Sequence, residues 1–313
     1  MNSQWPTGIP PVMGGHLMAS GITAPTSTST GCGTGPRHMF EYDDGEINTT
    51  VTVNSGAADA AADLAAVVSK AAADAIASKG SFTIALSGGS MINALASLAG
   101  GSTDWTKWHV LFADERIVAL DSDDSNFKGA SDAFLCKTGI PATQIYTVDP
   151  SLDPDAAAAA YAAKLAALPA DVMPTAGGMP VIDLVLLGVG PDGHVASLFP
   201  NRRSIAATGV VIGVADSPKP PAARISLSLP CINAAKQVVI YAVGGGKKEI
   251  VQRVLEVQAL PGALPAQLVA AQQVSWILDE ASAAMLATSQ WNEPKAYPRS
   301  EIPAPAGAKK KSA

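Results

Sequence analysis

A histidine stands in the glycine-rich stretch 187–200, which reads LGVGPDGHVASLFP. Glycines cost backbone entropy, so several of them close together indicate a turn where another group approaches the main chain. Asp192 and His194 flank Gly193, and a bent turn there can bring the carboxylate to one imidazole nitrogen. The other nitrogen is then free to act as a general base near neutral pH. We therefore expect Asp192 and His194 to be catalytic and Gly190 to border the substrate. A histidine that only satisfies a buried carbonyl is the alternative.

Two further glycine-rich turns have the composition of anion-binding loops. The first consists of Ser87, Gly88, Gly89 and Ser90, at a predicted strand-to-helix turn where exposed amides can bind a phosphate. It matches neither the GxxxxGK[ST] nor the GxGxxG pattern, and an ordinary tight turn is the alternative. The second is the segment 244–248, GGGKK. Its Lys247 stands at a predicted helix start, where a positive charge is unfavourable unless an anion is bound. Lys247 is therefore a candidate phosphate ligand, unless both lysines simply face water.

Charged residues also occur at the ends of two other predicted strands. Asp114, Glu115 and Arg116 directly follow an apolar strand, and Asn126 comes ten residues after Arg116. These residues either point into a ligand crevice or form a solvated strand end. Arg224 begins another predicted strand and has the same ambiguity. We take Asp114, Arg116, Asn126 and Arg224 as candidate substrate ligands.

The elements that must position these residues alternate along the chain. Apolar runs with little polar alternation are separated by helical stretches, which indicates a parallel sheet covered on both faces. In such sheets ligands bind beyond the carboxyl ends of the strands, where the polar clusters fall. We therefore predict one α/β domain over 47–290. The expected helices are 56–79, 90–98, one beginning near 125, 154–167 and 246–258; the expected strands are 82–86, 108–112, 181–187, 224–228, 237–243 and 274–278.

The two ends of the chain have the composition of appendages. Residues 1–46 open with a stretch rich in Ser, Thr, Gly and Pro, whose only formal charge up to residue 38 is Arg37. Such a segment cannot bury enough apolar surface to offset ordering, so we expect a disordered extension, either a weak transit peptide or a non-native leader. Residues 291–313 combine prolines with a terminal KKKSA and are expected to form a mobile tail.

Composition excludes several classes of protein. A formal net charge of −6 and a pI near 5.2 argue against a nucleic-acid groove, and no apolar run is long enough to cross a membrane. The three cysteines lack CxxC spacing, and no Cys, His or carboxylate cluster forms a plausible metal site. We therefore expect no metal and no cofactor. We also expect a cytoplasmic protein, with a minor organelle pool still compatible, that is a monomer or a weak dimer.

Taken together, the motifs resemble those of 6-phosphogluconolactonases. SGGS, DER with SN, LGVGPDGHVASLFP, DSPKPPAARISLSLP and VGGGKKEIVQRVL occur in that family's order, and the resemblance extends over about 47–288. It implies a three-layer α/β fold with a mostly parallel sheet, similar to that of glucosamine-6-phosphate deaminase. It also implies cofactor-free hydrolysis of 6-phospho-D-glucono-1,5-lactone in the pentose phosphate pathway. His194 would then activate water and Asp192 would orient it. Amides of the 188–193 turn would stabilise the oxyanion, while Arg116, Arg224, Lys247 and the 87–90 amides would hold the sugar phosphate.

Two departures from the family pattern and two alternative functions remain. Met91-Ile92 replace the Thr-Pro that usually follows SGGS, and the segment 201–209 lacks an acidic cluster found in relatives. A glucosamine-6-phosphate deaminase would have a glutamate five residues after its histidine, where this chain has Phe199. A non-catalytic sugar-phosphate sensor would need a partner-binding appendage, and the acidic chain offers neither a basic patch nor a helix-turn-helix.

Overall fold

A seven-stranded sheet organises the computed structural model, which describes residues 38–43, 48–257 and 264–287. Six neighbouring strands are parallel, and β1 pairs antiparallel with β2 at one edge. Within the described residues, no helix is long and apolar enough to cross a membrane. Across the sheet the order is β1 (His38–Asp43), β2 (Asn48–Asn54), β12 (Gln273–Asp279), β11 (Gln237–Ala242), β8 (Leu184–Gly188), β3 (Phe82–Leu86) and β4 (Trp108–Phe112).

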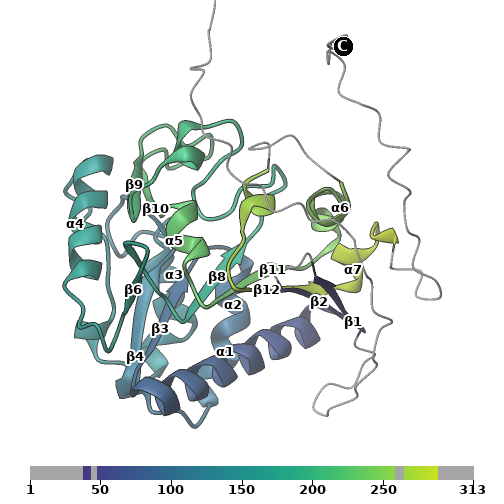
Figure 1. Ribbon diagram of the computed structural model, residues 1–313, viewed down its shortest axis with the longest axis horizontal. Coiled ribbons are helices and arrows are strands. Elements are labelled where there is room, and N and C mark those ends of the chain that lie inside the picture. Colours follow the sequence, from purple (N-terminus) through teal and green to yellow (C-terminus); the bar gives the residue numbers. More distant parts are fainter. Residues whose placement is uncertain (1–37, 44–47, 258–263, 288–313) are drawn as a thin grey trace, which may run out of the picture.

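Helices cover both faces of this sheet and make three layers (Figure 1). Successive strand residues point to opposite faces, so in β3 Phe82 and Ile84 belong to one apolar core while Ala85 belongs to the other. The first core contains α1 (Ala57–Lys79), α2 (Ser90–Ala94), the 3₁₀ turn η1 (Leu95–Gly100) and α3 (Asn126–Ala133). The second contains α4 (Pro154–Ala166), α5 (Leu229–Asn233), α6 (Lys248–Glu256) and α7 (Glu280–Ala283). The predicted three-layer α/β fold is confirmed.

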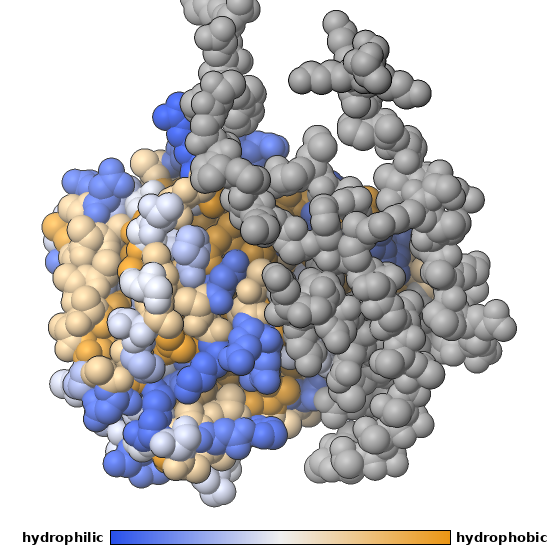
Figure 2. All heavy atoms as spheres, viewed as in Figure 1, coloured by the Kyte–Doolittle hydropathy of each residue, from blue (hydrophilic) through white to orange (hydrophobic). Residues whose placement is uncertain are grey.

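Local sequence signals explain where several of these helices begin. Ser125 accepts a hydrogen bond from the Lys128 amide at the start of α3, and Asp153 accepts two from the first turn of α4. The exposed positions of α4 include Ala159, Ala163 and Ala166. Because alanine is only weakly hydrophobic, the α4 side of the molecule is pale orange at the left of Figure 2.

A second, three-stranded antiparallel sheet lies beyond the main one, in the order β5 (Asp114–Arg116), β10 (Arg224–Leu227) and β9 (Val211–Val214). The sequence analysis placed the strand 224–228 in the parallel sheet, and this is wrong. The strand joins the small sheet because β5, which continues the chain just after β4, offers it a free antiparallel edge. A short hairpin is formed by β6 (Thr175–Ala176) and β7 (Met179–Pro180).

The other predicted helices and strands are present with ends shifted by a few residues. The sequence did not predict β1, β2, β5, β6, β7, β9, α5 or α7. Strand β1 lies inside the 1–46 segment expected to be disordered, so that expectation is wrong for His38–Asp43, whose backbone pairs with β2 over six residue pairs. The remainder of 1–46 and the predicted tail 291–313 lie outside the described residues. The limits of the predicted domain, 47–290, stay a prediction.

A buried ionic cluster holds the amino-terminal edge of the sheet. The Asp183 carboxylate, just before β8, accepts hydrogen bonds from the Thr83 amide at 2.9 Å and the Thr83 hydroxyl at 2.8 Å. It also forms ion pairs with Lys79 at 2.9 Å and Lys236 at 2.8 Å. A buried carboxylate is costly unless it is paired, so Asp183 needs these partners. Because the partners lie on different elements, the cluster joins α1, β3, β8 and the start of β11.

Candidate active site

The four polar clusters found in the sequence follow four adjacent strands, in the order β11, β8, β3, β4. After β3 the chain proceeds to β4 on one side, whereas β8 pairs with the other side of β3. Strand order therefore reverses between β3 and β8, and such a switch point opens a crevice beyond the strand ends. Here the Ser87 amide donates to the Leu186 carbonyl at 3.1 Å, so the loops after β3 and β8 lie side by side.

The turn 188–194 presents the histidine on a compact frame. The Nδ1 atom of His194 lies 2.5 Å from Oδ1 of Asp192. The Gly190 amide donates to the His194 carbonyl at 2.9 Å, and Gly193 has a φ of +85°, which favours glycine. A Cβ added to Gly190 would lie only 2.0 Å from both Nδ1 and Cε1 of His194. Gly190 is thus required for the imidazole to pack against the turn.

The environment keeps this imidazole neutral. Burial is the largest effect and lowers the His194 pKa; Lys219 lowers it further, while Asp192 and Asp114 oppose the change. With Asp192 bound at Nδ1, the proton of the neutral ring belongs on Nδ1, and no described residue forms a hydrogen bond with Nε2. The Phe199 ring lies 4.7 Å from the imidazole centroid to centroid and walls one side of it. His194 therefore has the tautomer and the unbonded nitrogen of a general base.

Lys219 joins this pair and was missed by the sequence analysis. Its Nζ atom lies 3.4 Å from Nδ1 of His194 and 3.6 Å from Oδ1 of Asp192. Lys219 belongs to the motif DSPKPP, which contributed to the family resemblance. A lysine in a proline-rich loop has no periodic pattern, so the sequence could not show that it lies beside a turn 25 residues earlier in the chain.

Asp114 has a different environment from the one expected for a substrate ligand. It is buried, and its two carboxylate oxygens accept hydrogen bonds from the Ser87 hydroxyl at 2.6 Å and the Ser197 hydroxyl at 2.7 Å. Asp114 thereby connects the 87–90 loop to the segment that follows His194. These contacts fit a residue that shapes the crevice, and direct contact with substrate stays a prediction.

Asn126 packs directly on the 87–90 loop. A Cβ on Gly88 would lie 2.1 Å from its side-chain oxygen, and its Nδ2 atom donates to the Asp114 carbonyl at 2.8 Å. The buried Glu115 carboxylate accepts from the amides of Asn126, Phe127 and Arg116, each at 2.8 Å. Burial raises the Glu115 pKa, and these amides oppose the rise. Glu115 thus fixes the start of α3, a role that the sequence analysis did not assign.

Arg116 and Arg224 lie directly opposite each other on β5 and β10. Like charges in this position are unfavourable unless an anion separates them. Nη1 of Arg116 donates to the Asp124 carbonyl at 2.7 Å, whereas its Nε is buried and has no partner among the described residues. Burial, followed by Arg116, lowers the Arg224 pKa. Arg116 thus uses fewer of its donors within the protein than Arg224 does.

Arg224 already uses most of its donors within the protein. Nε donates to the Pro221 carbonyl at 2.8 Å, and Nη2 donates to the carbonyls of Lys219 and Pro220 at 3.0 Å each. Nη1 makes a long contact, 3.4 Å, with the Ser197 hydroxyl. A substrate contact by Arg224 stays a prediction, and few of its N–H groups are left for one.

Lys247, after β11, and the loop 87–90, after β3, lie on opposite sides of the turn that follows β8. The half-buried Lys247 ammonium donates to the Val189 carbonyl at 2.8 Å, and burial, then Lys219, lowers its pKa while Asp192 raises it. Gly89, with φ +90°, and Ser90 are exposed, and the described residues provide no acceptor for the Gly88 and Gly89 amides. These groups are open to a ligand.

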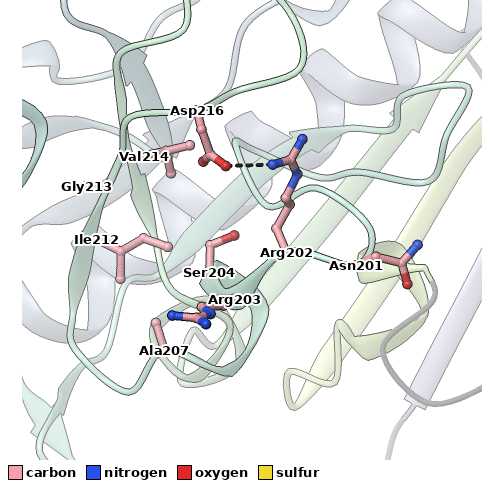
Figure 3. A pocket seen from close by; sticks show the side chains of 9 residues that line it. All are labelled: Asn201, Arg202, Arg203, Ser204, Ala207, Ile212, Gly213, Val214 and Asp216. Carbon is pink, nitrogen blue, oxygen red and sulfur yellow. Dashed lines mark hydrogen bonds and ion pairs between the residues drawn. The ribbon is translucent and has the colours of Figure 1, made fainter. Parts of the chain in front are cut away.

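A separate pocket of about 530 Å³ lies between β9 and the segment 201–207 (Figure 3). Arg202 and Asp216, which form a 2.6 Å ion pair, stand on its wall, and neither His194 nor Asp192 lines it. Val214 of this pocket pairs with Arg224 in the small sheet, and none of the candidate site residues lines the pocket. We assign the chemistry to the strand ends because the titratable groups meet there. No group of three or more His, Cys, Asp or Glu residues that could hold a metal is found in the described part of the chain.

The comparisons with known proteins identify the family of the chain. Residues 55–277 match the family of glucosamine-6-phosphate isomerases and 6-phosphogluconolactonases, and the chain belongs to this family. It is 38% identical to a rat 6-phosphogluconolactonase over 247 residues, which cover 75% of this chain and 93% of the relative. It is also 38% identical to a rice protein described as a probable chloroplastic 6-phosphogluconolactonase, over 72% of each chain.

Solved structures support the same assignment. The 6-phosphogluconolactonase of Leishmania guyanensis superposes with a TM-score of 0.67 at 26% identity, over 76% of this chain and 98% of that one. A glucosamine-6-phosphate deaminase superposes with a TM-score of 0.61 at 17% identity and shares the fold.

Proposed function

We propose that this chain hydrolyses 6-phospho-D-glucono-1,5-lactone to 6-phospho-D-gluconate, a step of the pentose phosphate pathway. The observation that carries the proposal is the Asp192–His194 pair, whose Nε2 is unbonded at the edge of the crevice. Family membership and relatives that are named for this activity support it. The reaction needs neither a metal nor a cofactor, and a small sugar phosphate is the only partner that it requires.

In the proposed mechanism His194 removes a proton from water through Nε2. The hydroxide attacks the lactone carbonyl carbon. Amides of the 188–193 turn other than those of Gly190 and Gly193, which already donate within the turn, stabilise the resulting oxyanion. Collapse of the tetrahedral intermediate breaks the bond to the ring oxygen, which receives the proton from the imidazolium. Asp192 keeps the ring oriented throughout and stabilises its transient positive charge.

The charge of the crevice suits an anionic substrate. Lys219 and Lys247 lie at the turn that carries His194, and Arg116 lies directly opposite Arg224 in the small sheet. We propose that Arg116, Lys247 and the amides of the 87–90 loop hold the phosphate and hydroxyls. We further propose that the protein acts in the cytoplasm as a monomer or a weak dimer.

The decisive experiment compares wild type with His194→Ala. The variant should lose about two to four orders of magnitude of lactonase turnover while it still binds 6-phosphogluconate. Lactone disappearance is measured against its spontaneous hydrolysis. Turnover within a few-fold of wild type would remove His194 from the role. Wild type that binds 6-phosphogluconate without accelerating hydrolysis would make the protein a sensor.

Deamination of glucosamine 6-phosphate is the second candidate, and Phe199 argues against it. The Phe199 ring is buried and lies 4.7 Å from the imidazole, where it can neither accept nor donate a proton. We expect no ammonia release from glucosamine 6-phosphate in the same preparation. Saturable release would reverse the order of the two functions.

A further inference from the structure

The loop 217–221 brings Lys219 to the Asp192–His194 pair. Its Lys219 ammonium lies within 3.6 Å of both Nδ1 of His194 and Oδ1 of Asp192. In the neutral ring Nδ1 carries its proton toward Asp192, so the contact between Nζ and Nδ1 is electrostatic and not a hydrogen bond. The Asp192 carboxylate therefore has two cationic or proton-donating neighbours, the imidazole and the ammonium.

The backbone of this loop is fixed by Arg224. The buried guanidinium donates to three consecutive carbonyls, those of Lys219, Pro220 and Pro221. Ser217 adds a hydrogen bond from its hydroxyl to the Lys219 carbonyl at 2.8 Å. Because the Arg224 backbone belongs to β10, the position of Lys219 is tied to the small sheet.

We propose that Lys219 is a positioning residue for the catalytic pair: its ammonium holds the Asp192 carboxylate against Nδ1 and opposes a positive charge on the imidazole, while Arg224 holds Lys219 in place. The consequence is a base that stays unprotonated at lower pH. This inference rests on the proposed lactonase activity for its kinetic consequence, but its electrostatic part can be measured without substrate.

The charges around the imidazole define what the ammonium must do. Asp192, in the same turn, and Asp114, on β5, both favour a protonated ring, whereas Lys219 opposes it. Lys247, on the turn before α6, interacts with Asp192 and Lys219. Lys219 is thus the cation that most directly offsets the two carboxylates. Burial lowers the His194 pKa most, and Lys219 lowers it further.

The test replaces Lys219 by methionine, which keeps most of the side-chain volume and removes the charge. The protein contains four histidines, so the His194 imidazole signal can be assigned in NMR spectra by its loss in His194→Ala. We expect the titration midpoint of His194 to move to higher pH in Lys219→Met and to return in Lys219→Arg. Lys107→Met, an exposed lysine before β4, is the matched control and should leave the midpoint unchanged.

Kinetics provide the second measurement. For each protein the ratio of kcat at pH 6 to kcat at pH 8 is measured. This ratio should be about three-fold lower in Lys219→Met than in wild type, and KM should change less than two-fold. Spontaneous hydrolysis is subtracted at each pH. A midpoint that does not move overturns the proposal, as does a large rise in KM with an unchanged pH profile, since Lys219 would then be a substrate ligand. If wild type has no lactonase activity, the proposed function fails while the titration still tests Lys219.

The role of Arg224 is tested by a double-mutant cycle. If Arg224 acts through Lys219, Arg224→Lys should shift the His194 midpoint in the same direction, and adding it to Lys219→Met should produce little further shift. Additive shifts would show that Arg224 affects His194 independently and would overturn this part of the proposal.

Discussion

Substitution of Gly190 by alanine tests whether the turn fixes the position of the base. A Cβ at this position would lie 2.0 Å from Nδ1 and Cε1 of His194 and 2.6 Å from Oδ1 of Asp192. Since ordinary contact begins at 3.4 Å, the imidazole must move by about 1.4 Å. A displacement of about 1 Å in a catalytic group costs roughly 100-fold in rate. We expect Gly190→Ala to lower kcat by at least about 100-fold.

The fold should survive the same change, because the φ of Gly190 is outside the left-handed region and the displaced ring can turn toward the crevice. Lactonase turnover and thermal unfolding are measured together, with Gly100→Ala as the control; a Cβ there meets nothing within 4 Å. The control should match wild type in both measurements. Gly190→Ala with nearly full turnover and an unchanged Tm would refute the reasoning, since the imidazole would not depend on the missing side chain.

Two further predictions concern residues at the amino ends and at the carboxyl ends of the strands. Asp183→Ala should lower the free energy of unfolding by about 3–5 kcal/mol at pH 7 in urea titrations and leave kcat within two-fold. Burial alone would raise the Asp183 pKa, but Lys236, Lys79 and the Thr83 amide lower it below the unfolded value of 3.8. The stability that ionised Asp183 contributes is therefore fully present above pH 3.8. The difference in unfolding free energy between variant and wild type should shrink as pH falls below 3.8. Lys247→Ala should weaken binding of 6-phosphogluconate by one to two decades and barely affect gluconate in isothermal titrations, because a charge-assisted phosphate contact contributes about 1.5–3 kcal/mol. Equal losses for both ligands would show that Lys247 acts only through the Val189 carbonyl.

The parallel sheet could be predicted from the sequence because its central strands are continuous apolar runs. Strands such as β3 and β11 are buried on both faces, and this leaves a clear signal. Strand β2 alternates threonine with valine, and β9 contains a glycine, so neither resembles a fully buried strand. Strand β10 was recognised as a strand, but its partners depend on where β5 lies, and pairing of this kind is not encoded locally.

Within the candidate site, glycine spacing led to the Asp192–His194 pair, and the structure brings the two side chains together. The sequence could not show that Arg224 is directed at backbone carbonyls, or that Lys219 reaches the imidazole. Both contacts arise from tertiary packing of the loop 217–221, in which prolines give no periodic pattern. The role of Glu115 at the start of α3 could not be predicted for a related reason, since its partners are amides that carry no residue-specific signature.

The main sheet separates two apolar cores, and each core supports a different part of the candidate site. Met91 and Ile92 of α2 belong to one core and lie next to the loop 87–90, whereas Ile250 and Leu264 belong to the other and lie beneath Gly193. Substitutions in the first core should therefore change the position of the loop 87–90 and with it substrate binding. Substitutions in the second core should change the position of the turn that carries His194. Substrate affinity and turnover could then change separately in evolution, each through substitutions of buried core residues that support the site from below.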